Sequence, residues 1–290
     1  KKINDIIGDA KTIGIAGHLR PDGDCMGSCM SLYNYLKKNR PDLDVRVFLE
    51  FVDKKFNIIE NTDQIITTGY DGTKFDLFIS LDTASLDRLG LNLPFYENAK
   101  RTACIDHHAS NDGYADYNYI LPKASSASEV LYDLLDEDLI DKSIAEPMYM
   151  GIAHDSGVFR FQSTTPKTMR IAANMIEKGV NVNMILEETF FRKTYNQMMV
   201  TAKIQSEAVL ALDGKCIYGY CTSEMMEEYG VTTKDLDAVV ASIRNVDGVE
   251  VAMFLYQLSE DSYKVSLRSK NYVDVSKIAV ENGGGGHVRA

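Results

Sequence analysis

Histidine and aspartate gather at a few places in this sequence. The chain contains only five histidines, and four of them lie in or beside a segment that also carries aspartate. The segments rich in these residues are His18–Asp24, Asp82, Asp106–His108 and His154–Asp155. Carboxylate oxygens and imidazole nitrogens are ligands for divalent metal ions. If the four segments meet in space, they form a metal site.

Each segment taken alone also has an ordinary structural interpretation. Asp22-Gly23-Asp24 is typical of a turn, Asp82 of a helix cap or strand-end turn, and His154 of a partly buried helix residue. If there were no metal site, all of these ordinary interpretations would have to hold at once, and the similar positions of the segments relative to apolar runs would be a coincidence. The metal site is therefore favoured.

Short apolar runs predict the elements that position these residues. We expect strands at Thr12–Ala16, Val45–Leu49, Leu77–Leu81 and Thr102–Ile105, and helices at Met26–Leu36, Ser126–Leu135, Ile144–Ala153 and Pro166–Lys178. Strands that alternate with helices predict a parallel sheet that is covered on both faces. The carboxyl ends of such strands line one crevice, so residues far apart in the chain can meet there.

A long helical pattern separates this α/β region from a second one. Residues 182–212 predict a helical connector because neither Pro nor Gly interrupts them. Beyond it we expect strands at Cys216–Cys221, Val249–Leu258 and Tyr263–Arg268, and helices at Thr233–Asn245 and Val275–Asn282. This pattern predicts a smaller α/β domain with a mixed sheet. The expected boundaries are 1–188 for the first domain, 189–203 for the connector and 204–290 for the second domain.

The composition limits the class of partner. The 290 residues carry a formal net charge of −11, which argues against a broad basic surface for long duplex nucleic acid. A small anionic substrate remains compatible if bound metal ions supply positive charge. The five cysteines form no CxxC pair, which favours reduced thiols in the cytosol. The sequence has no membrane-length apolar run and no signal-like start, so we expect a cytoplasmic protein without a membrane partner.

The donor set indicates which metal would bind. Aspartate oxygens and histidine nitrogens, without thiolate, suit Mn²⁺ best, and Mg²⁺, Co²⁺ or Fe²⁺ are alternatives. The aspartates and histidines are numerous enough for two ions if one aspartate bridges them. Two ions about 3.5–4 Å apart are the usual device for phosphoester hydrolysis.

The motifs then resemble a known family. The segments "GHLRPDGDCMGS", "SLDTAS", "CIDHHASN" and "GIAHDSGVF" resemble the four ordered motifs of the DHH phosphoesterases, and "SLRSK" and "GGGGHVRA" resemble motifs of the associated DHHA1 domain. Within this family the chain is most similar to bacterial bifunctional nanoRNases (oligoribonucleases) and pAp phosphatases. The resemblance implies metal-dependent hydrolysis of short RNA oligonucleotides to mononucleotides, and of pAp to AMP and phosphate.

The resemblance also implies roles for individual residues. One metal ion would be held by His18, Asp22 and Asp82, and the other by Asp24, Asp82, His107 and Asp155. Asp82 would thus bridge the two ions. Asp106 would orient a histidine, and His108 would donate a hydrogen bond or a proton to the leaving oxygen.

The second domain is expected to bind the nucleotide. The resemblance implies substrate contacts from Arg268, Ser269, Gly285, Gly286 and His287. Glycines let backbone N–H groups approach a phosphate, and an arginine can grip a phosphate through two N–H groups. The chain departs from the family pattern at Ser156, where threonine is usual, and it stops at Ala290, soon after the glycine-rich motif.

Two other functions stay open at this point. A phosphodiesterase for signalling dinucleotides such as pApA or cyclic di-AMP would need the same metals and a similar nucleoside pocket. A non-catalytic nucleotide sensor is disfavoured because every ligand position of the family is filled. A homodimer is compatible with each of these functions.

Overall fold

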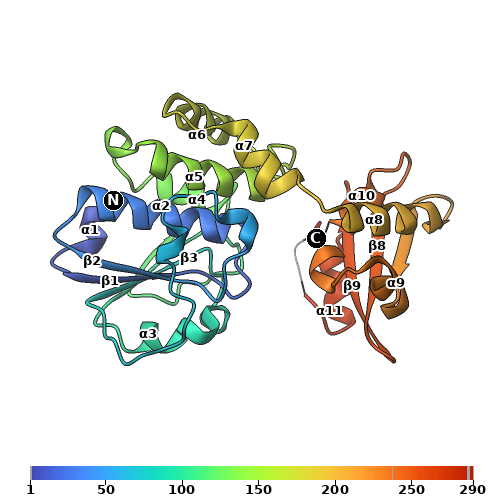
Figure 1. The fold of residues 1–290 in the computed structure, drawn as a ribbon, viewed down its shortest axis with the longest axis horizontal. Helices are drawn as coiled ribbons and strands as arrows, with labels where there is room; N and C mark the ends of the chain where they lie inside the picture. Colours follow the sequence, from blue (N-terminus) through green and yellow to red (C-terminus); the bar gives the residue numbers. More distant parts are fainter. Residues whose placement is uncertain (1, 237, 286–287, 290) are drawn as a thin grey trace. The chain divides into compact units, whose positions relative to one another are not determined.

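The computed structural model describes residues 2–236, 238–285 and 288–289 (Figure 1). The chain divides into two compact units, residues 1–192 and residues 193–290, and each unit contains one sheet. Gly286 and His287, which the sequence predicts as substrate contacts, lie outside the described residues.

A five-stranded parallel sheet forms the centre of the first unit. In the order β2-β1-β3-β4-β5, its strands are β2 (Asp44–Phe48), β1 (Thr12–Ala16), β3 (Leu77–Leu81), β4 (Thr102–Asp106) and β5 (Tyr117–Ile120). The predicted parallel sheet and its first four strands are confirmed. Strand β5 has no counterpart in the prediction, because its partly exposed sequence YNYI contains no apolar run.

Helices cover the sheet of the first unit on both sides (Figure 1). The α-helices are α1 (Ile3–Ile7), α2 (Gly23–Asn39), α3 (Leu93–Glu97), α4 (Ala127–Tyr132), α5 (Lys142–Asp155), α6 (Pro166–Glu177) and α7 (Val182–Leu186). The shorter turns are the 3₁₀-helices η1 (Lys54–Phe56), η2 (Thr62–Gln64), η3 (Leu86–Asn92) and η4 (Glu137–Leu139) and the π-helix η5 (Glu187–Phe191). A large apolar cluster joins the strands to α2, α4 and α5. A second cluster contains Phe48, Phe75, Phe78 and Phe95.

Helices α2 and α5 approach each other closely at two glycines. A Cβ on Gly27 would lie 2.4 Å from the carbonyl oxygen of Pro147. A Cβ on Gly151 would lie 2.0 Å from Ser128 Oγ and 2.7 Å from Asp24 Oδ1. Because a side chain does not fit at either position, glycine allows the first turn of α2, the start of α4 and the end of α5 to meet.

The long helix expected over residues 182–212 is wrong, because the structure interrupts it. Helix α7 continues into η5, and a separate helix α8 (Tyr195–Glu207) begins after residues 192–194. Thr194 and Gln197 form a capping box, in which each side chain accepts a hydrogen bond from the backbone N–H of the other residue. Such a box starts a new helix without Pro or Gly. Helix α8 lies in the second unit.

A four-stranded mixed sheet forms the second unit. Its elements besides α8 are β6 (Val209–Ala211), β7 (Cys216–Cys221), β8 (Val251–Ser259), β9 (Ser262–Ser269), α9 (Ser223–Tyr229), η6 (Thr233–Leu236), α10 (Val239–Arg244) and α11 (Val275–Glu281). The strand order is β6-β7-β8-β9, with β7 and β8 parallel and the other pairs antiparallel. The predicted mixed sheet is confirmed. Val200 and Ile204 of α8 pack in its core with Ile217, Val240 and Phe254.

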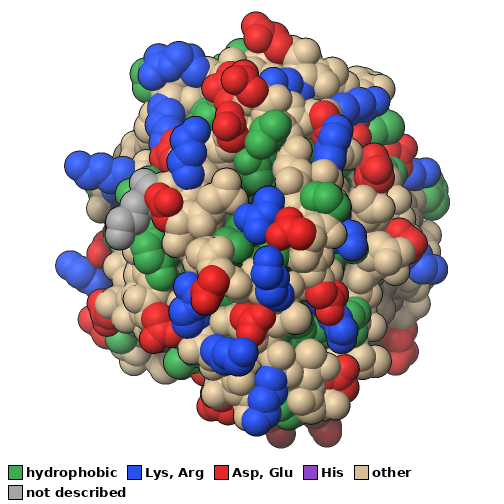
Figure 2. Space-filling model, turned by 90° about the vertical axis from the view of Figure 1, so that its left-hand side faces the viewer, with side chains coloured by type: hydrophobic (Ala, Val, Ile, Leu, Met, Phe, Trp, Pro, Cys, Tyr) green, Lys and Arg blue, Asp and Glu red, His purple; other side chains and the backbone are tan. Residues whose placement is uncertain are grey.

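The surface carries both signs of charge. Acidic and basic side chains are interspersed over the face drawn in Figure 2, with apolar side chains between them. Among the described residues, every helix is too short or too polar to span a lipid bilayer.

Candidate metal centre

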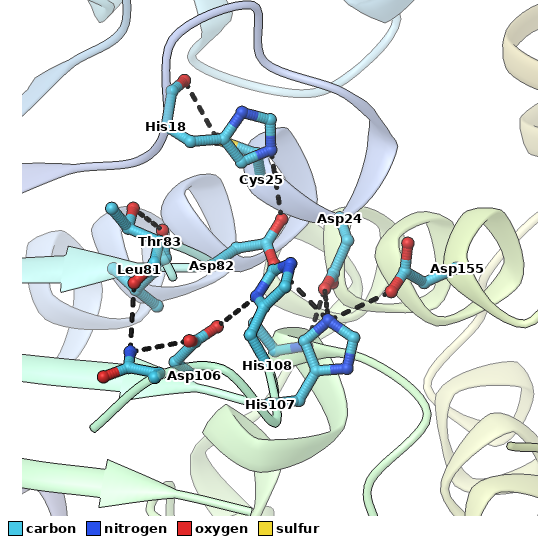
Figure 3. A network of polar contacts seen from close by, with 12 residues as sticks. His18, Asp24, Cys25, Leu81, Asp82, Thr83, Asp106, His107, His108 and Asp155 are labelled. Carbon is cyan, nitrogen blue, oxygen red and sulfur yellow. Dashed lines mark hydrogen bonds and ion pairs between the residues drawn. The ribbon is translucent and has the colours of Figure 1, made fainter. Parts of the chain in front are cut away.

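The four histidine and aspartate segments meet at the carboxyl ends of the central strands (Figure 3). His18 lies two residues after β1, Asp82 directly follows β3, and Asp106 ends β4. Asp24 lies in the first turn of α2, and Asp155 is the last residue of α5. The parallel sheet therefore brings together side chains from distant parts of the sequence, as the positions of the strands predict.

Asp82 lies at the centre of the cluster. Its Oδ2 is 3.4 Å from His18 Nε2, and its Oδ1 is 3.5 Å from His107 Nε2 and 3.7 Å from His108 Nδ1. The residue is only 3% exposed, and Oδ1 accepts no hydrogen bond. Its backbone φ is +51°, and its N–H donates to the Ile105 carbonyl at 3.1 Å. A left-handed aspartate costs about 1–3 kcal/mol and persists only where its surroundings hold it in place.

His107 joins Asp82 to two further carboxylates. Its Nε2 is 3.1 Å from Asp155 Oδ2 and 4.0 Å from Asp24 Oδ2. Figure 3 shows these carboxylates pointing toward the same imidazole from different helices. The carboxylates of Asp24, Asp82 and Asp155 therefore surround one ring nitrogen.

Asp24 is fully buried and tightly held. Its Oδ2 accepts a hydrogen bond from the Ala127 N–H at 2.6 Å. Its Oδ1 accepts from the Ser128 N–H at 3.0 Å and from the Ser128 hydroxyl at 2.6 Å. These bonds fix the carboxylate of α2 against the start of α4.

Asp22 has two separate roles in the geometry. Its Oδ1 caps α2 by accepting from the backbone N–H groups of Asp24 and Cys25, at 3.0 and 3.1 Å. Its Oδ2 lies 3.7 Å from His18 Nε2. The turn interpretation and the ligand interpretation of this segment are therefore compatible with each other.

Asp106 contacts His108 rather than the other carboxylates. Its Oδ1 accepts from His108 Nδ1 at 2.8 Å, and its Oδ2 accepts from Asn111 Nδ2 at 2.7 Å. Asn111 Nδ2 also donates to the Thr83 carbonyl at 3.1 Å. Asn111 is a residue that sequence reasoning missed, although it ends the quoted segment "CIDHHASN" and so lies inside a recognised motif.

His154 lies apart from the cluster. Its Nε2 is 2.9 Å from the hydroxyl of Thr189, and its ring packs edge-on against Phe56 and Phe190. Burial, with a smaller contribution from Lys55, lowers the pKa of His154 to about 4. The interpretation of His154 as a buried helix residue therefore fits the structure.

The cluster shifts the pKa values of its members strongly. Burial lowers the pKa of His107, but contacts with Asp155 and Asp82 outweigh burial and raise it to about 12. Burial also raises the pKa of Asp24 well above its usual range, and it raises the pKa of Asp155. Despite burial, contacts with His107 and His18 hold the pKa of Asp82 below its usual range. Burial thus disfavours the charged forms of Asp24 and Asp155, whereas the neighbouring imidazoles favour the charged form of Asp82.

The residues present fit a divalent cation. Ligand atoms lie within 4.8 Å of one another in three groups, which are His18 with Cys25 and Asp82, Asp82 with His107 and His108, and Asp24 with His107 and Asp155. The buried Asp82 Oδ1 that accepts no hydrogen bond is an acceptor that a cation would satisfy. Burial raises the pKa values of Asp24 and Asp155, and a bound cation would favour their charged forms.

Known proteins share both regions of the chain. A model described as "DHH family, N-terminal domain" matches residues 12–152, and one described as "DHHA1 domain" matches residues 213–290. The bifunctional oligoribonuclease and PAP phosphatase NrnA of Thermus thermophilus is 32% identical over 288 residues, which cover 96% of this chain and 82% of that protein. The chain belongs to the DHH family. The DHH family consists of metal-dependent hydrolytic phosphoesterases.

Other DHH relatives and structures agree with this assignment. The protein of the same name from Bacillus subtilis is 27% identical over 281 residues, which cover 95% of this chain and 87% of that protein. The crystal structure of an exopolyphosphatase-related protein from Bacteroides fragilis has a TM-score of 0.89 at 22% identity, covering 99% of this chain and 87% of the other. At this identity the likeness shows the fold alone, and it covers nearly all of the chain.

The predicted substrate contacts of the DHHA1 region that the structure describes lie in different surroundings. Arg268 and Ser269 are neighbours on β9, so their side chains point to opposite faces of the sheet. The Ser269 hydroxyl is buried and donates to the Val273 carbonyl at 2.7 Å. Arg268 Nη1 donates to the Leu267 carbonyl at 2.9 Å. Gly285 lies in the loop after α11.

Glu250 organises the segment that follows β9 in the DHHA1 region. Its Oε1 accepts hydrogen bonds from the backbone N–H groups of Asn271, Tyr272 and Val273, at 2.9, 2.7 and 3.0 Å. Arg289 Nη1 donates to the Val273 carbonyl at 2.7 Å, which ties the end of the chain to the same segment. Sequence reasoning missed Glu250, because no local pattern marks a contact between the residue before β8 and the segment that follows the neighbouring strand β9.

Proposed function

We propose that this protein is a two-metal phosphoesterase that hydrolyses short oligoribonucleotides to mononucleotides and pAp to AMP and phosphate. The observation that carries the proposal is the position of Asp82, whose two carboxylate oxygens face His18 and His107 separately. A carboxylate in this position can bridge two ions, as in other phosphoester hydrolases. The names of the Thermus and Bacillus relatives support the substrate class.

The proposed ligands form two sets that share Asp82. One set is His18, Asp22 and Asp82, and the other is Asp24, Asp82, His107 and Asp155. When bound, the ions would supply Lewis acidity to the phosphoryl oxygens and to an attacking water. Mn²⁺ suits these oxygen and nitrogen donors, and Mg²⁺, Co²⁺ or Fe²⁺ are alternatives. Ser128 would keep the Asp24 carboxylate oriented toward the ions.

His108 is the proposed proton donor to the leaving oxygen. Its Nδ1 is held by Asp106, which assigns the transferable proton to Nε2. Burial lowers the pKa of His108, but the contacts with Asp106 and Asp82 outweigh burial and raise it. Asp106 thus acts through His108, and Asn111 holds Asp106 in turn.

The second unit is proposed to bind the nucleoside end of the substrate. In this proposal residues 1–188 carry out catalysis, residues 189–203 join the domains, and residues 204–290 bind substrate. Arg268, Ser269, Gly285, Gly286 and His287 are the proposed contacts. The net charge of −11 favours short substrates over long duplex nucleic acid. The cytoplasm is the proposed location, because all five cysteines are free thiols.

Turnover of end-labelled di- to pentaribonucleotides and of pAp, in Mn²⁺, tests this function. We expect the wild type to release mononucleotides and phosphate, and Asp82→Asn to abolish both reactions. Asp9→Asn is the matched control, since the Asp9 side chain is 98% exposed and should not affect turnover.

Three other outcomes of this experiment would each lead to a different conclusion about the function. Unchanged turnover in Asp82→Asn would rule out the proposed site. Hydrolysis restricted to pApA or cyclic di-AMP would instead identify a phosphodiesterase for signalling dinucleotides. Nucleotide binding without hydrolysis would identify a sensor.

A further inference from the structure

The backbone that carries Asp82 is held by side chains from the segment after β4. Tyr114 Oη donates a hydrogen bond to the Thr83 carbonyl oxygen at 2.9 Å, and Asn111 Nδ2 donates to the same oxygen at 3.1 Å. Thr83 is fully buried, and its own hydroxyl donates to the Leu81 carbonyl at 2.9 Å (Figure 3). Hydrogen bonds therefore fix the residues on both sides of Asp82.

The conformation of Asp82 depends on such support. Its φ of +51° is left-handed, and a residue with a side chain keeps this conformation only where its surroundings hold it. The Asp82 N–H donates to a carbonyl of β4 at 3.1 Å, so the bond from Tyr114 to Thr83 holds the other side of the same turn. If the turn relaxed, the Asp82 carboxylate would rotate away from His18 and His107, which face its two oxygens.

The hydroxyl of Tyr114 is itself placed by its neighbours. Ser80 Oγ lies 3.0 Å from Tyr114 Oη. The Tyr96 hydroxyl donates to the backbone carbonyl of Tyr114 at 2.8 Å, and the two tyrosine rings pack edge to face with their centroids 5.9 Å apart. Tyr114 thus has a fixed position, from which it reaches Asp82 through the backbone of Thr83.

We propose that Tyr114 is a positioning residue for the metal bridge: its hydroxyl holds the Thr83 carbonyl and so keeps Asp82 in the conformation that turns one carboxylate oxygen toward each ion. The inference rests on the proposed function, in which Asp82 bridges two ions. The hydroxyl is the group that acts, because phenylalanine would keep the ring and lose the hydrogen bond. Residues that hold a metal ligand in place contribute about 10–100-fold to metal affinity or activity.

Tyr114→Phe tests the inference because it removes the hydroxyl and keeps the ring. We expect isothermal titration to show Mn²⁺ binding weakened by about 10-fold, the lower end of the range for a residue that holds a metal ligand. At saturating Mn²⁺, kcat for a ribodinucleotide should fall while KM stays unchanged, because the hydroxyl acts on the ions and not on the nucleoside. Replacing Tyr114 by 4-aminophenylalanine, which keeps an N–H donor at the same place, should restore both values.

Tyr96→Phe is the matched control. It also removes a buried tyrosine hydroxyl and one hydrogen bond, but it leaves the bond from Tyr114 to Thr83 in place. We expect both variants to lose similar stability in urea denaturation, and only Tyr114→Phe to lose Mn²⁺ affinity. Equal Mn²⁺ affinities of the wild type and Tyr114→Phe would overturn the inference. An equal loss of affinity in both variants would also contradict it, since the effect would then come from packing in general.

Electron paramagnetic resonance of the Mn²⁺-loaded protein gives a second readout. Two Mn²⁺ ions joined by one carboxylate couple magnetically, and their spectrum differs from that of isolated ions. We expect the coupled spectrum in the wild type and in Tyr96→Phe, and a larger share of uncoupled ions in Tyr114→Phe. A fully coupled spectrum in Tyr114→Phe would show that Asp82 keeps its position without the hydroxyl.

The results separate this inference from the proposed function. If the wild type binds two coupled Mn²⁺ ions and hydrolyses its substrates, and Tyr114→Phe behaves identically, only the role of Tyr114 is overturned. A wild type that binds no Mn²⁺, or only uncoupled ions, overturns the proposed bridge and the inference together.

Discussion

At the scale of single residues, the backbone of Asp82 has a left-handed conformation that most residues with a side chain avoid. Asparagine tolerates this conformation better than most other residues. Asp82→Asn therefore removes the negative charge while it keeps both the shape and the backbone. An alanine exchange would combine loss of charge with added backbone strain, so Asp82→Asn is the sharper test of the bridging role.

His108 should matter most for substrates with a poor leaving group. We expect His108→Ala to slow the hydrolysis of RNA dinucleotides by about 10²–10⁴-fold, the usual contribution of a general acid. A p-nitrophenyl ester of AMP should lose much less activity, because its leaving group needs no proton. The ratio of kcat values for the two substrates measures the effect. Equal losses on both would show that His108 does not donate the proton.

The residues of the site could be predicted to different degrees. His18, Asp82 and Asp106 follow apolar runs, so their meeting at one edge of a parallel sheet follows from the sequence pattern alone. Asn111 could not be found in this way. Its contact with Asp106 depends on which side chains lie beside each other in space, and the spacing of apolar runs carries no signal for that.

At the scale of elements, the site depends on how closely α2, α4 and α5 approach. Alanine in a helix interior normally stabilises it by about 0.5–1 kcal/mol relative to glycine. At Gly151 the sign should reverse, because a Cβ would lie 2.0 Å from Ser128 Oγ and 2.7 Å from Asp24 Oδ1. Glycine is required at this position because an added side chain would clash with its neighbours, although alanine has the higher helix propensity.

We therefore expect Gly151→Ala to lower the free energy of unfolding by about 1–3 kcal/mol, a typical cost of overpacking. It should also weaken Mn²⁺ binding, because the clash reaches the Asp24 carboxylate. Chemical denaturation and isothermal titration with Mn²⁺ measure the two effects. Gly69→Ala is the control, since its added Cβ would meet nothing closer than 3.8 Å. Similar behaviour of the two variants would contradict this account.

Asp76 should make the start of the sheet sensitive to acid. Contact with Lys100, and hydrogen bonds from the N–H groups of Lys11 and Thr12, hold the pKa of Asp76 below its usual range. A depressed folded-state pKa gives stability that is present above the unfolded pKa, about 3.9, and is lost as the pH falls through the folded value. Asp76→Asn should thus cost more unfolding free energy at pH 7 than at pH 3.

Urea denaturation at several pH values checks the prediction for Asp76. The difference between wild type and Asp76→Asn should shrink steadily below pH 4. The exposed control Asp9→Asn should show a smaller and flatter difference. A constant difference for Asp76→Asn across this range would mean that its charge does not stabilise the sheet.

Prediction of the elements succeeded where the pattern was long and apolar. Strands β1 and β3 match their predicted bounds because both are almost wholly buried. The continuous helix over 182–212 failed because its interruption depends on the capping box of Thr194 and Gln197. A search for Pro and Gly does not detect that boundary, although the spacing of Thr194 and Gln197 is itself a sequence signature of a helix start.

At the scale of the whole molecule, the metal centre belongs to one unit and should stabilise that unit alone. All proposed ligands lie in residues 1–192, whereas the second unit has its own apolar core. A ligand that binds only the native state stabilises it by about 2.7 kcal/mol at a concentration of 100 Kd. This stabilisation should make local opening of the backbone segments that carry the ligands less frequent.

Hydrogen exchange measured by mass spectrometry, with and without Mn²⁺, tests this expectation. Mn²⁺ should slow exchange in the segments that carry the ligands, residues 18–24, 82, 107 and 155, and leave residues 213–285 unchanged. Asp82→Asn should lose the protection. Equal slowing in both units would show that the ion acts on the second unit as well.

Glu250 has a consequence for how the second unit can recognise anions. Its carboxylate already occupies the three consecutive backbone N–H groups of residues 271–273. A phosphate of an incoming nucleotide would have to expel that carboxylate in order to use the same amides. If the second unit binds nucleotides as proposed, their phosphates must contact side chains or other stretches of backbone, because these three amides are already hydrogen-bonded to Glu250.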